Sequence, residues 1–215
     1  MLLIFDWDGT LADSKDHIVN AMQAAIEELS LPAQDREACA RMIGLGLLEV
    51  SKRLFPDLAS DGHQRFAETY SHHFTRLRLE YGGTQFFPRA LPTLRELKAR
   101  GHSLAVATGK SRRGLDRVLL ADNIEDLFVA TRAADETESK PSPRMLNELL
   151  NETGTAVDDA VMIGDTSYDL EMATRAGMQS IAVSYGVHSV ADLREYKPAL
   201  IIDCMSELLH WPALG

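Results

Sequence analysis

The amino-acid sequence predicts an α/β protein with a Rossmann-like parallel sheet as its core and an inserted all-helical domain. From Pro88 onward, short apolar runs that are typical of buried strands alternate with segments of helical periodicity. Such alternation is typical of parallel sheets with right-handed crossovers. An isolated strand, residues 2–5, can bury itself only by joining that sheet. Residues 15–86, which separate it from the rest, show helical patterns and no convincing strand.

The insertion begins directly after the first strand. Its apolar residues recur at helical spacing, and we expect helices at about 18–29, 34–42, 47–54 and 64–81. The glycine pair Gly82-Gly83 and the following Pro88 indicate a loop that leads out of the block. We therefore expect residues 1–14 and 87–215 to form a discontinuous core, and residues 15–86 to form a separate helical domain.

The remaining elements complete the sheet. We expect strands at 103–107, 127–130, 160–163, 180–183 and 200–202, and helices at 90–100, 112–120, 143–150 and 168–176. The carboxyl ends of parallel strands lie at the same edge of a sheet, where ligands bind in open α/β proteins. Side chains that follow these strands should therefore converge.

The composition restricts the possible partners. The chain has 22 basic and 32 acidic residues, a formal charge of −10, which argues against nucleic-acid and anionic membrane partners. Its cysteines, Cys39 and Cys204, have no metal-ligand spacing and fit a reducing compartment. No apolar run approaches the ~20 residues of a membrane span, and Asp6 comes too early for a signal peptide. We expect a soluble, cytoplasmic protein.

Two carboxylates follow the first strand, in the run Asp6-Trp7-Asp8-Gly9-Thr10. Residues two apart in an extended segment share a face, so Asp6 and Asp8 should project together. Carboxylates held so close repel each other unless a cation, a proton or hydrogen bonds compensate. A carboxylate can attack phosphorus, and a second one can donate and accept the protons. Asp6 is therefore a candidate nucleophile and Asp8 a candidate general acid and base.

Further acidic residues follow the strand expected at 160–163. Asp165 and Asp169 together with the first pair would offer oxygen ligands only, which suits Mg²⁺. Asp169 has a second interpretation, because Thr166 and Asp169 also match a helix capping box.

Two other loops carry polar groups that could hold a phosphate. Lys140 precedes Pro141, which favours an extended lysine, and we expect Ser142 to cap a helix that begins at Pro143. Thr108 and Gly109 offer a hydroxyl and a backbone N–H, either to phosphate oxygens or as a helix cap. The neighbouring cations are expected to be surface charges: Lys110, Arg112 and Arg113.

These motifs together resemble those of a known family. Residues 6–14 (DWDGTLADS), Thr108, the run Lys140-Pro141-Ser142-Pro143 and the run 164–169 (GDTSYD) are similar in type and order to the four motifs of the haloacid dehalogenase-like hydrolases. The resemblance is to the phosphoglycolate phosphatase-like branch and extends from Leu2 to about Ile202. It implies that the helical domain is a cap over the active site.

The resemblance also implies the roles of individual residues. Catalysis would rest on Asp6, Asp8, Lys140 and Thr108, with Mg²⁺ held by Asp6, Asp8, Asp165 and Asp169. Substrate would be bound by Thr108, Gly109, Lys140, Gly44 and Gly46. Gly109 departs from the asparagine that is most often expected there, which leaves only backbone contacts at this position. The Gly44-Leu45-Gly46 loop would approach the leaving group, although a simple helix–helix turn explains it equally well.

The expected activity is Mg²⁺-dependent hydrolysis of a small phosphomonoester through an aspartyl-phosphate. The expected partner is a small phosphorylated metabolite, and the expected state a monomer or homodimer. A phosphomutase of the same superfamily would share Asp6, Asp8, Lys140 and Asp165 and stays open, as does a noncatalytic phosphate-binding regulatory module. A dehalogenase has no use for Asp8 or a Mg²⁺ cluster.

Overall fold

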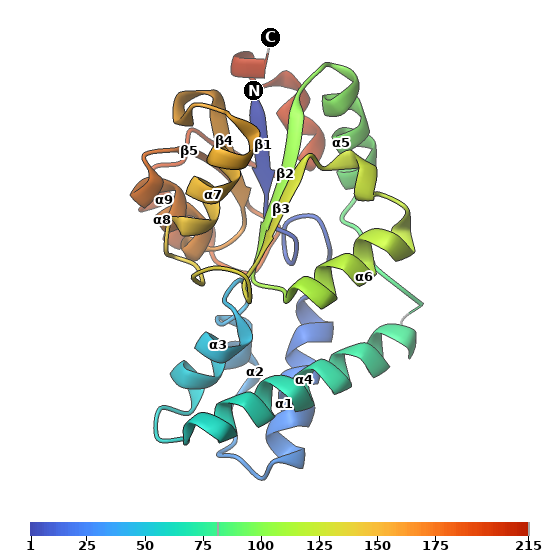
Figure 1. Ribbon diagram of the computed structural model, residues 1–215, viewed down its shortest axis with the longest axis vertical. Coiled ribbons are helices and arrows are strands. Elements are labelled where there is room, and N and C mark those ends of the chain that lie inside the picture. Colours follow the sequence, from blue (N-terminus) through green and yellow to red (C-terminus); the bar gives the residue numbers. More distant parts are fainter. Residues whose placement is uncertain (81, 215) are drawn as a thin grey trace.

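The computed structural model describes residues 1–80 and 82–214, in which six strands form one parallel sheet (Figure 1). The strand order is β3-β2-β1-β4-β5-β6. Their bounds are β1 Leu2–Phe5, β2 Ser103–Thr108, β3 Ala130–Ala133, β4 Ala160–Gly164, β5 Gln179–Val183 and β6 Leu200–Ile202. The predicted fold class is confirmed, and the N-terminal strand lies near the middle of the sheet.

Helices cover both faces of the sheet. Within the core they are α5 Ala90–Ala99, α6 Arg112–Asp122, α7 Arg144–Thr153, α8 Ser167–Ala176 and α9 Val190–Arg194. Figure 1 shows α5 and α6 on one side of the strands and α7 and α8 on the other. This is the doubly wound arrangement that the alternation of strands and helices predicted.

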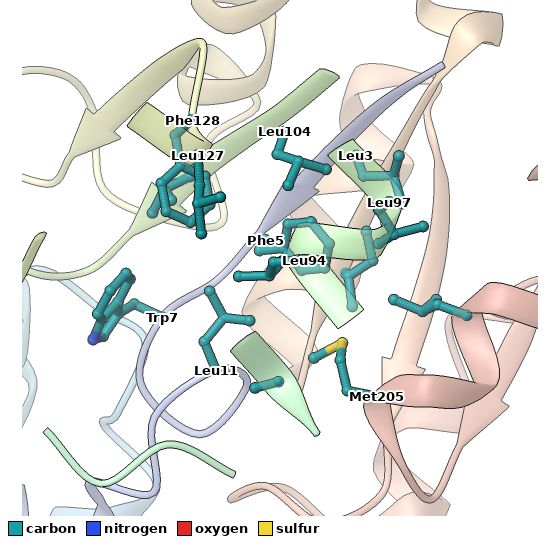
Figure 2. Close-up of a cluster of buried hydrophobic side chains, with 14 of the residues drawn as sticks. Leu3, Phe5, Trp7, Leu11, Leu94, Leu97, Leu104, Leu127, Phe128 and Met205 are labelled. Carbon is teal, nitrogen blue, oxygen red and sulfur yellow. The ribbon is translucent and has the colours of Figure 1, made fainter. Parts of the chain in front are cut away.

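Alternate residues of β1 pack on opposite faces of the sheet. Leu3 and Phe5 pack with Leu94 and Leu97 of α5 in the apolar cluster that Figure 2 shows. Their neighbours on the strand, Leu2 and Ile4, face the opposite cluster, to which α7 and α8 contribute. Because both faces are buried, the strand is apolar throughout, as parallel strands usually are.

The first four helices after β1 form a separate group at one end of the sheet (Figure 1). They are α1 Lys15–Glu28, α2 Arg36–Ala40, α3 Leu47–Leu54 and α4 Ser60–Glu80. Their apolar faces enclose a core of their own, with Phe66 and Cys39 completely buried. This group, residues 15–86, is called the cap below. The last residue of the predicted helix 64–81, Tyr81, lies outside the described residues.

The strand predicted at 127–130 is displaced in the structure. Residues Glu125–Leu127 form a single 3₁₀ turn, and β3 begins only at Ala130. Leu127 and Phe128 are buried under the sheet without belonging to it. The strand itself carries Arg132, whose side chain pairs with two glutamates of α7. The apolar residues belong to a buried loop, and the edge strand that follows it carries polar side chains. The prediction from hydrophobicity therefore started the strand too early.

Other boundaries also differ from the expectations. The helix predicted from Pro143 begins at Arg144 with Pro143 as its N-cap, so the capping role expected of Ser142 was wrong. The short helix α9 was missed, although Ser189 and Asp192 mark its start with a side-chain cap. No helix within residues 1–80 and 82–214 is long and apolar enough to cross a bilayer.

Candidate functional site

Three strand ends bring the candidate residues to one edge of the sheet. Phe5, the last residue of β1, is in register with Val106 of β2 and Ile163 of β4. Asp6 follows directly, and its backbone N–H donates to the Ile163 carbonyl at 2.9 Å. The convergence expected from the topology of parallel strands therefore places Thr108 and the loop after β4 next to Asp6.

Asp6, Asp165 and Asp169 form a cluster of buried carboxylates. One oxygen of each side chain lies within 4.8 Å of the others. Asp165 accepts hydrogen bonds from the hydroxyl of Thr10 at 2.8 Å and from the backbone N–H of Val187 at 2.9 Å. Asp6 Oδ2, in contrast, has no hydrogen-bond partner among the residues that the structure describes. This oxygen is available to a cation or a reactant.

Asp169 forms the predicted capping box and is also part of the carboxylate cluster. Its Oδ2 accepts hydrogen bonds from Thr166 N at 3.1 Å and Thr166 Oγ1 at 2.7 Å, which completes the capping box of α8. Its Oδ1 accepts a hydrogen bond from Lys140 Nζ at 2.6 Å. The helix-capping hydrogen bonds from Thr166 hold the Asp169 carboxylate at the cluster.

Lys140 reaches the cluster from the loop between β3 and α7. Its side chain is completely buried, and Nζ lies 2.8 Å from Asp6 Oδ1 as well as 2.6 Å from Asp169 Oδ1. Lys140, which is far from both aspartates in the sequence, thus lies between their carboxylates in the structure. It is a positive charge directly beside the candidate nucleophile.

The cluster contains more negative than positive charge. Three buried carboxylates face one buried ammonium, which leaves a formal charge of −2. Burial, and the charge of Asp169, raise the pKa of Asp165 to about 7. Burial raises the pKa of Asp6 well above its ordinary value, although Lys140 opposes the shift. An additional cation in the cluster would oppose both shifts, because it favours the charged carboxylates.

Asp8 lies outside this cluster and has different partners. Its Oδ1 accepts a hydrogen bond from Ser14 Oγ at 2.6 Å and forms an ion pair with Lys110 Nζ at 2.9 Å. Lys110 also lies over the ring of Phe74 in the cap, 4.7 Å from its centroid. The expectation that Lys110 is a surface charge was therefore wrong, since both side chains of this pair are about nine-tenths buried.

Thr108 ends β2 and is completely buried. It does not cap the next helix, because α6 begins at Arg112 and Ser111 caps it by accepting a hydrogen bond from Gly114 N. The Thr108 hydroxyl accepts a hydrogen bond from Lys110 N at 3.2 Å and still has a proton to donate.

The cap loop with Gly44 and Gly46 is pressed against the core. Gly44 has a φ of +100°, which favours glycine, and a Cβ atom on Gly109 would lie 2.6 Å from the Gly44 carbonyl oxygen. The backbone N–H of Gly46 donates to Ser139 Oγ at 2.9 Å. The glycines thus allow two backbones to meet, and the loop does more than join two helices within the cap.

A cavity of about 670 Å³ lies between the cap and the core, and this loop borders it. Asp6 and Asp8 are at its core end, together with Gly109 and Lys110. The geometry therefore places the cap loop and the two candidate catalytic aspartates around one cavity.

Sequence reasoning assigned no role to three residues that contact the aspartates: Thr10, Ser14 and Lys110. Thr10 and Ser14 belong to the run 6–14, so their closeness to Asp8 in the sequence could have indicated that they belong to the site. Lys110 had no such signal, because its partner Asp8 lies far away in the sequence.

Comparison with known proteins agrees with this geometry. The family model of the haloacid dehalogenase-like hydrolases matches residues 3–183. The chain belongs to the haloacid dehalogenase-like hydrolases. This hydrolase is 34% identical over 210 residues to a protein of Dickeya dadantii named "Probable phosphatase IndB", covering 97% of this chain and 91% of the relative.

Two further relatives cover nearly the whole chain. One is the phosphoglycolate phosphatase of Vibrio parahaemolyticus, 28% identical, with 100% of this chain and 96% of the relative covered. The other is the solved structure of a haloacid dehalogenase-like family hydrolase from Streptococcus pneumoniae. It is 25% identical and superposes with a TM-score of 0.80 over 97% of this chain and 96% of that one.

Proposed function

We propose that this hydrolase is a Mg²⁺-dependent phosphatase that cleaves a small phosphomonoester through a phosphate ester of Asp6. One observation carries the proposal: Asp6 is buried at the end of a cavity, beside an excess of negative charge, with an oxygen that has no hydrogen-bond partner within the described residues. The relatives that are named phosphatases support the same class of reaction.

The residues present fit a divalent cation. A formal charge of −2 in the cluster equals what one such ion would neutralise, and the donors are all carboxylate oxygens. Oxygen-only ligand sets suit Mg²⁺, which keeps several waters and takes one or two carboxylates together with substrate phosphate. Asp6, Asp165 and Asp169 would hold the ion. The Asp8 carboxylate is engaged elsewhere, so the proposed ligand at that residue is its backbone carbonyl, as the family resemblance implies.

When bound, Mg²⁺ would supply positive charge opposite the oxygens of the transferring phosphoryl group. The protein's own residues do the rest. A carboxylate oxygen of Asp6 attacks phosphorus, and the bond to the leaving alcohol breaks. Asp8 gives that alcohol its proton. In the second step Asp8 takes a proton from water, the water oxygen attacks phosphorus, and the Asp6 carboxylate is released.

Other groups position the phosphoryl group between these steps. Lys140, whose burial is offset by Asp6 and Asp169, stays charged and faces the site of attack. The Thr108 hydroxyl and the backbone N–H of Gly109 are proposed to donate to phosphoryl oxygens. Closure of the cap would exclude bulk water from them.

Turnover of an aryl phosphate by the purified protein tests the proposal. We expect hydrolysis in the presence of Mg²⁺, its loss after treatment with EDTA, and its return when excess Mg²⁺ is added. Ca²⁺ should restore little activity, because its coordination is larger and looser. Activity that survives exhaustive chelation would contradict the metal, and no activity on any phosphomonoester with Mg²⁺ would contradict the phosphatase.

Replacing Asp8 by asparagine should separate its role from that of Asp6. The asparagine cannot transfer the proton, a contribution of roughly 10²–10⁴ in rate. The loss of kcat/KM should be larger for alkyl phosphates than for aryl phosphates, whose leaving groups need less protonation. Paired measurements on the two ester classes check this. Equal losses in both, under conditions in which phosphoryl transfer limits the rate, would argue against Asp8 as the acid.

A further inference from the structure

We infer that the alcohol released by this enzyme is uncharged and has an apolar body larger than glycolate. The inference rests on the proposed phosphatase function and concerns the part of the cavity that lies beyond Asp6 and Asp8. That part is formed mainly by the cap.

The buried side chains that the cap contributes to the cavity are mainly apolar. Among the described residues, the buried cap side chains that line it are Ile18, Met22, Ile43, Leu45, Val50 and Tyr70. They come from α1, the loop before α3, α3 itself and α4, so several elements of the cap contribute to the apolar lining. A leaving group held there is removed from water, which favours apolar surface.

The lysine and arginines that line the cavity lie on its core side. These residues are Lys110, Arg113 and Arg117. Lys110 is paired with Asp8, and Arg117 donates to Thr75 Oγ1 at 2.6 Å. Arg113 is exposed to solvent.

The charged residues that the cap contributes to the cavity have the opposite sign. Within the described part of the cap, the titratable lining residues are Glu49, Glu68, Tyr70 and His72, and the lining includes neither a lysine nor an arginine. A carboxylate or second phosphate held on the cap side would therefore lose hydration and meet apolar, polar or acidic side chains without a lysine or arginine. Burying such a charge without a partner is unfavourable. Glycolate and phosphate are thus poor leaving groups for this cavity, and an uncharged apolar alcohol fits it.

Three substrates distinguish the effect of the leaving alcohol's charge from the effect of its size. Phosphoglycolate and its carboxamide have similar size and differ in charge, and benzyl phosphate adds an uncharged apolar body. All three release alkyl alcohols. We expect kcat/KM to rise from phosphoglycolate to the carboxamide to benzyl phosphate. The last step should be about tenfold or more, the discrimination that even one methylene can provide in an apolar pocket.

A cation placed on the cavity wall should change this order. Met42 lines the cavity at the edge of the cap core and is only half-buried, so Met42→Arg can add a charge there. We expect kcat/KM for phosphoglycolate to rise about fivefold, as a partly exposed ion pair allows, while that for the carboxamide does not rise. Leu79→Arg is the matched control, because Leu79 is 76% exposed on α4 and does not line the cavity. It should leave both values unchanged.

The possible outcomes distinguish this inference from the proposed function. If wild-type enzyme prefers phosphoglycolate to benzyl phosphate, the inference is overturned and the phosphatase stands. If no ester is hydrolysed with Mg²⁺ present, both fail. A Met42→Arg protein that misfolds by circular dichroism is replaced by Leu48→Arg, at a more exposed position on the same wall, with the same expected result. Gains of equal size for phosphoglycolate and its carboxamide would also overturn the inference.

Discussion

Replacing Asp6 by alanine should reduce kcat by about 10³-fold or more, because the variant lacks the oxygen that attacks phosphorus. The fold should survive. Asp6 is one of three buried carboxylates that face one ammonium, so its removal lowers the repulsion within the cluster. Steady-state rates on the best substrate, together with the thermal unfolding midpoint, check both expectations.

Asp13→Ala is a matched control for this variant. Asp13 lies in the same loop and is exposed to solvent, so its loss should leave the rate and the unfolding midpoint close to those of wild type. If the Asp6→Ala protein retained more than a few per cent of wild-type activity, Asp6 would not be the nucleophile.

The sheet and the position of the site could be predicted from the sequence because both depend on short-range patterns. Leu2–Phe5 is apolar throughout, as a strand buried on both faces must be, and the carboxylates come directly after it. The topology of a parallel sheet then brings Asp6 and Asp165 together without further information. The same reasoning failed for β3, because the buried residues Leu127 and Phe128 precede an edge strand that carries polar side chains.

Contacts between cap and core could not be predicted in this way. The position of Lys110 over the Phe74 ring and the hydrogen bond of Gly46 to Ser139 depend on how the cap packs against the core. A lysine or glycine on a loop carries no local signal of such a partner. Gly109 is an example. The Gly44 carbonyl of the cap occupies the space that a side chain at position 109 would fill.

Replacing Lys140 by methionine should abolish activity and also destabilise the fold. The buried lysine is the ammonium that offsets the carboxylate cluster, and removal of one partner of a buried ion pair costs about 3–5 kcal/mol. Denaturant unfolding in EDTA at pH 8 measures this loss. Lys98→Met is the control, because the ion pair of Lys98 with Asp126 is exposed and should contribute about 1 kcal/mol or less.

The loss caused by Lys140→Met should depend on pH in a definite direction. Burial raises the pKa of Asp165 to about 7 and that of Asp6 well above its ordinary value, and loss of the lysine raises both further. Between pH 8 and pH 6 the folded variant therefore takes up protons, whereas unfolded aspartates, which titrate near 3.8, take up none. Its stability should rise as the pH falls. The difference in unfolding free energy between the variant and wild type should therefore be smaller at pH 6 than at pH 8. An equal difference at the two pH values would show that the methionine acts through packing. It would contradict the expected repulsion between the carboxylates.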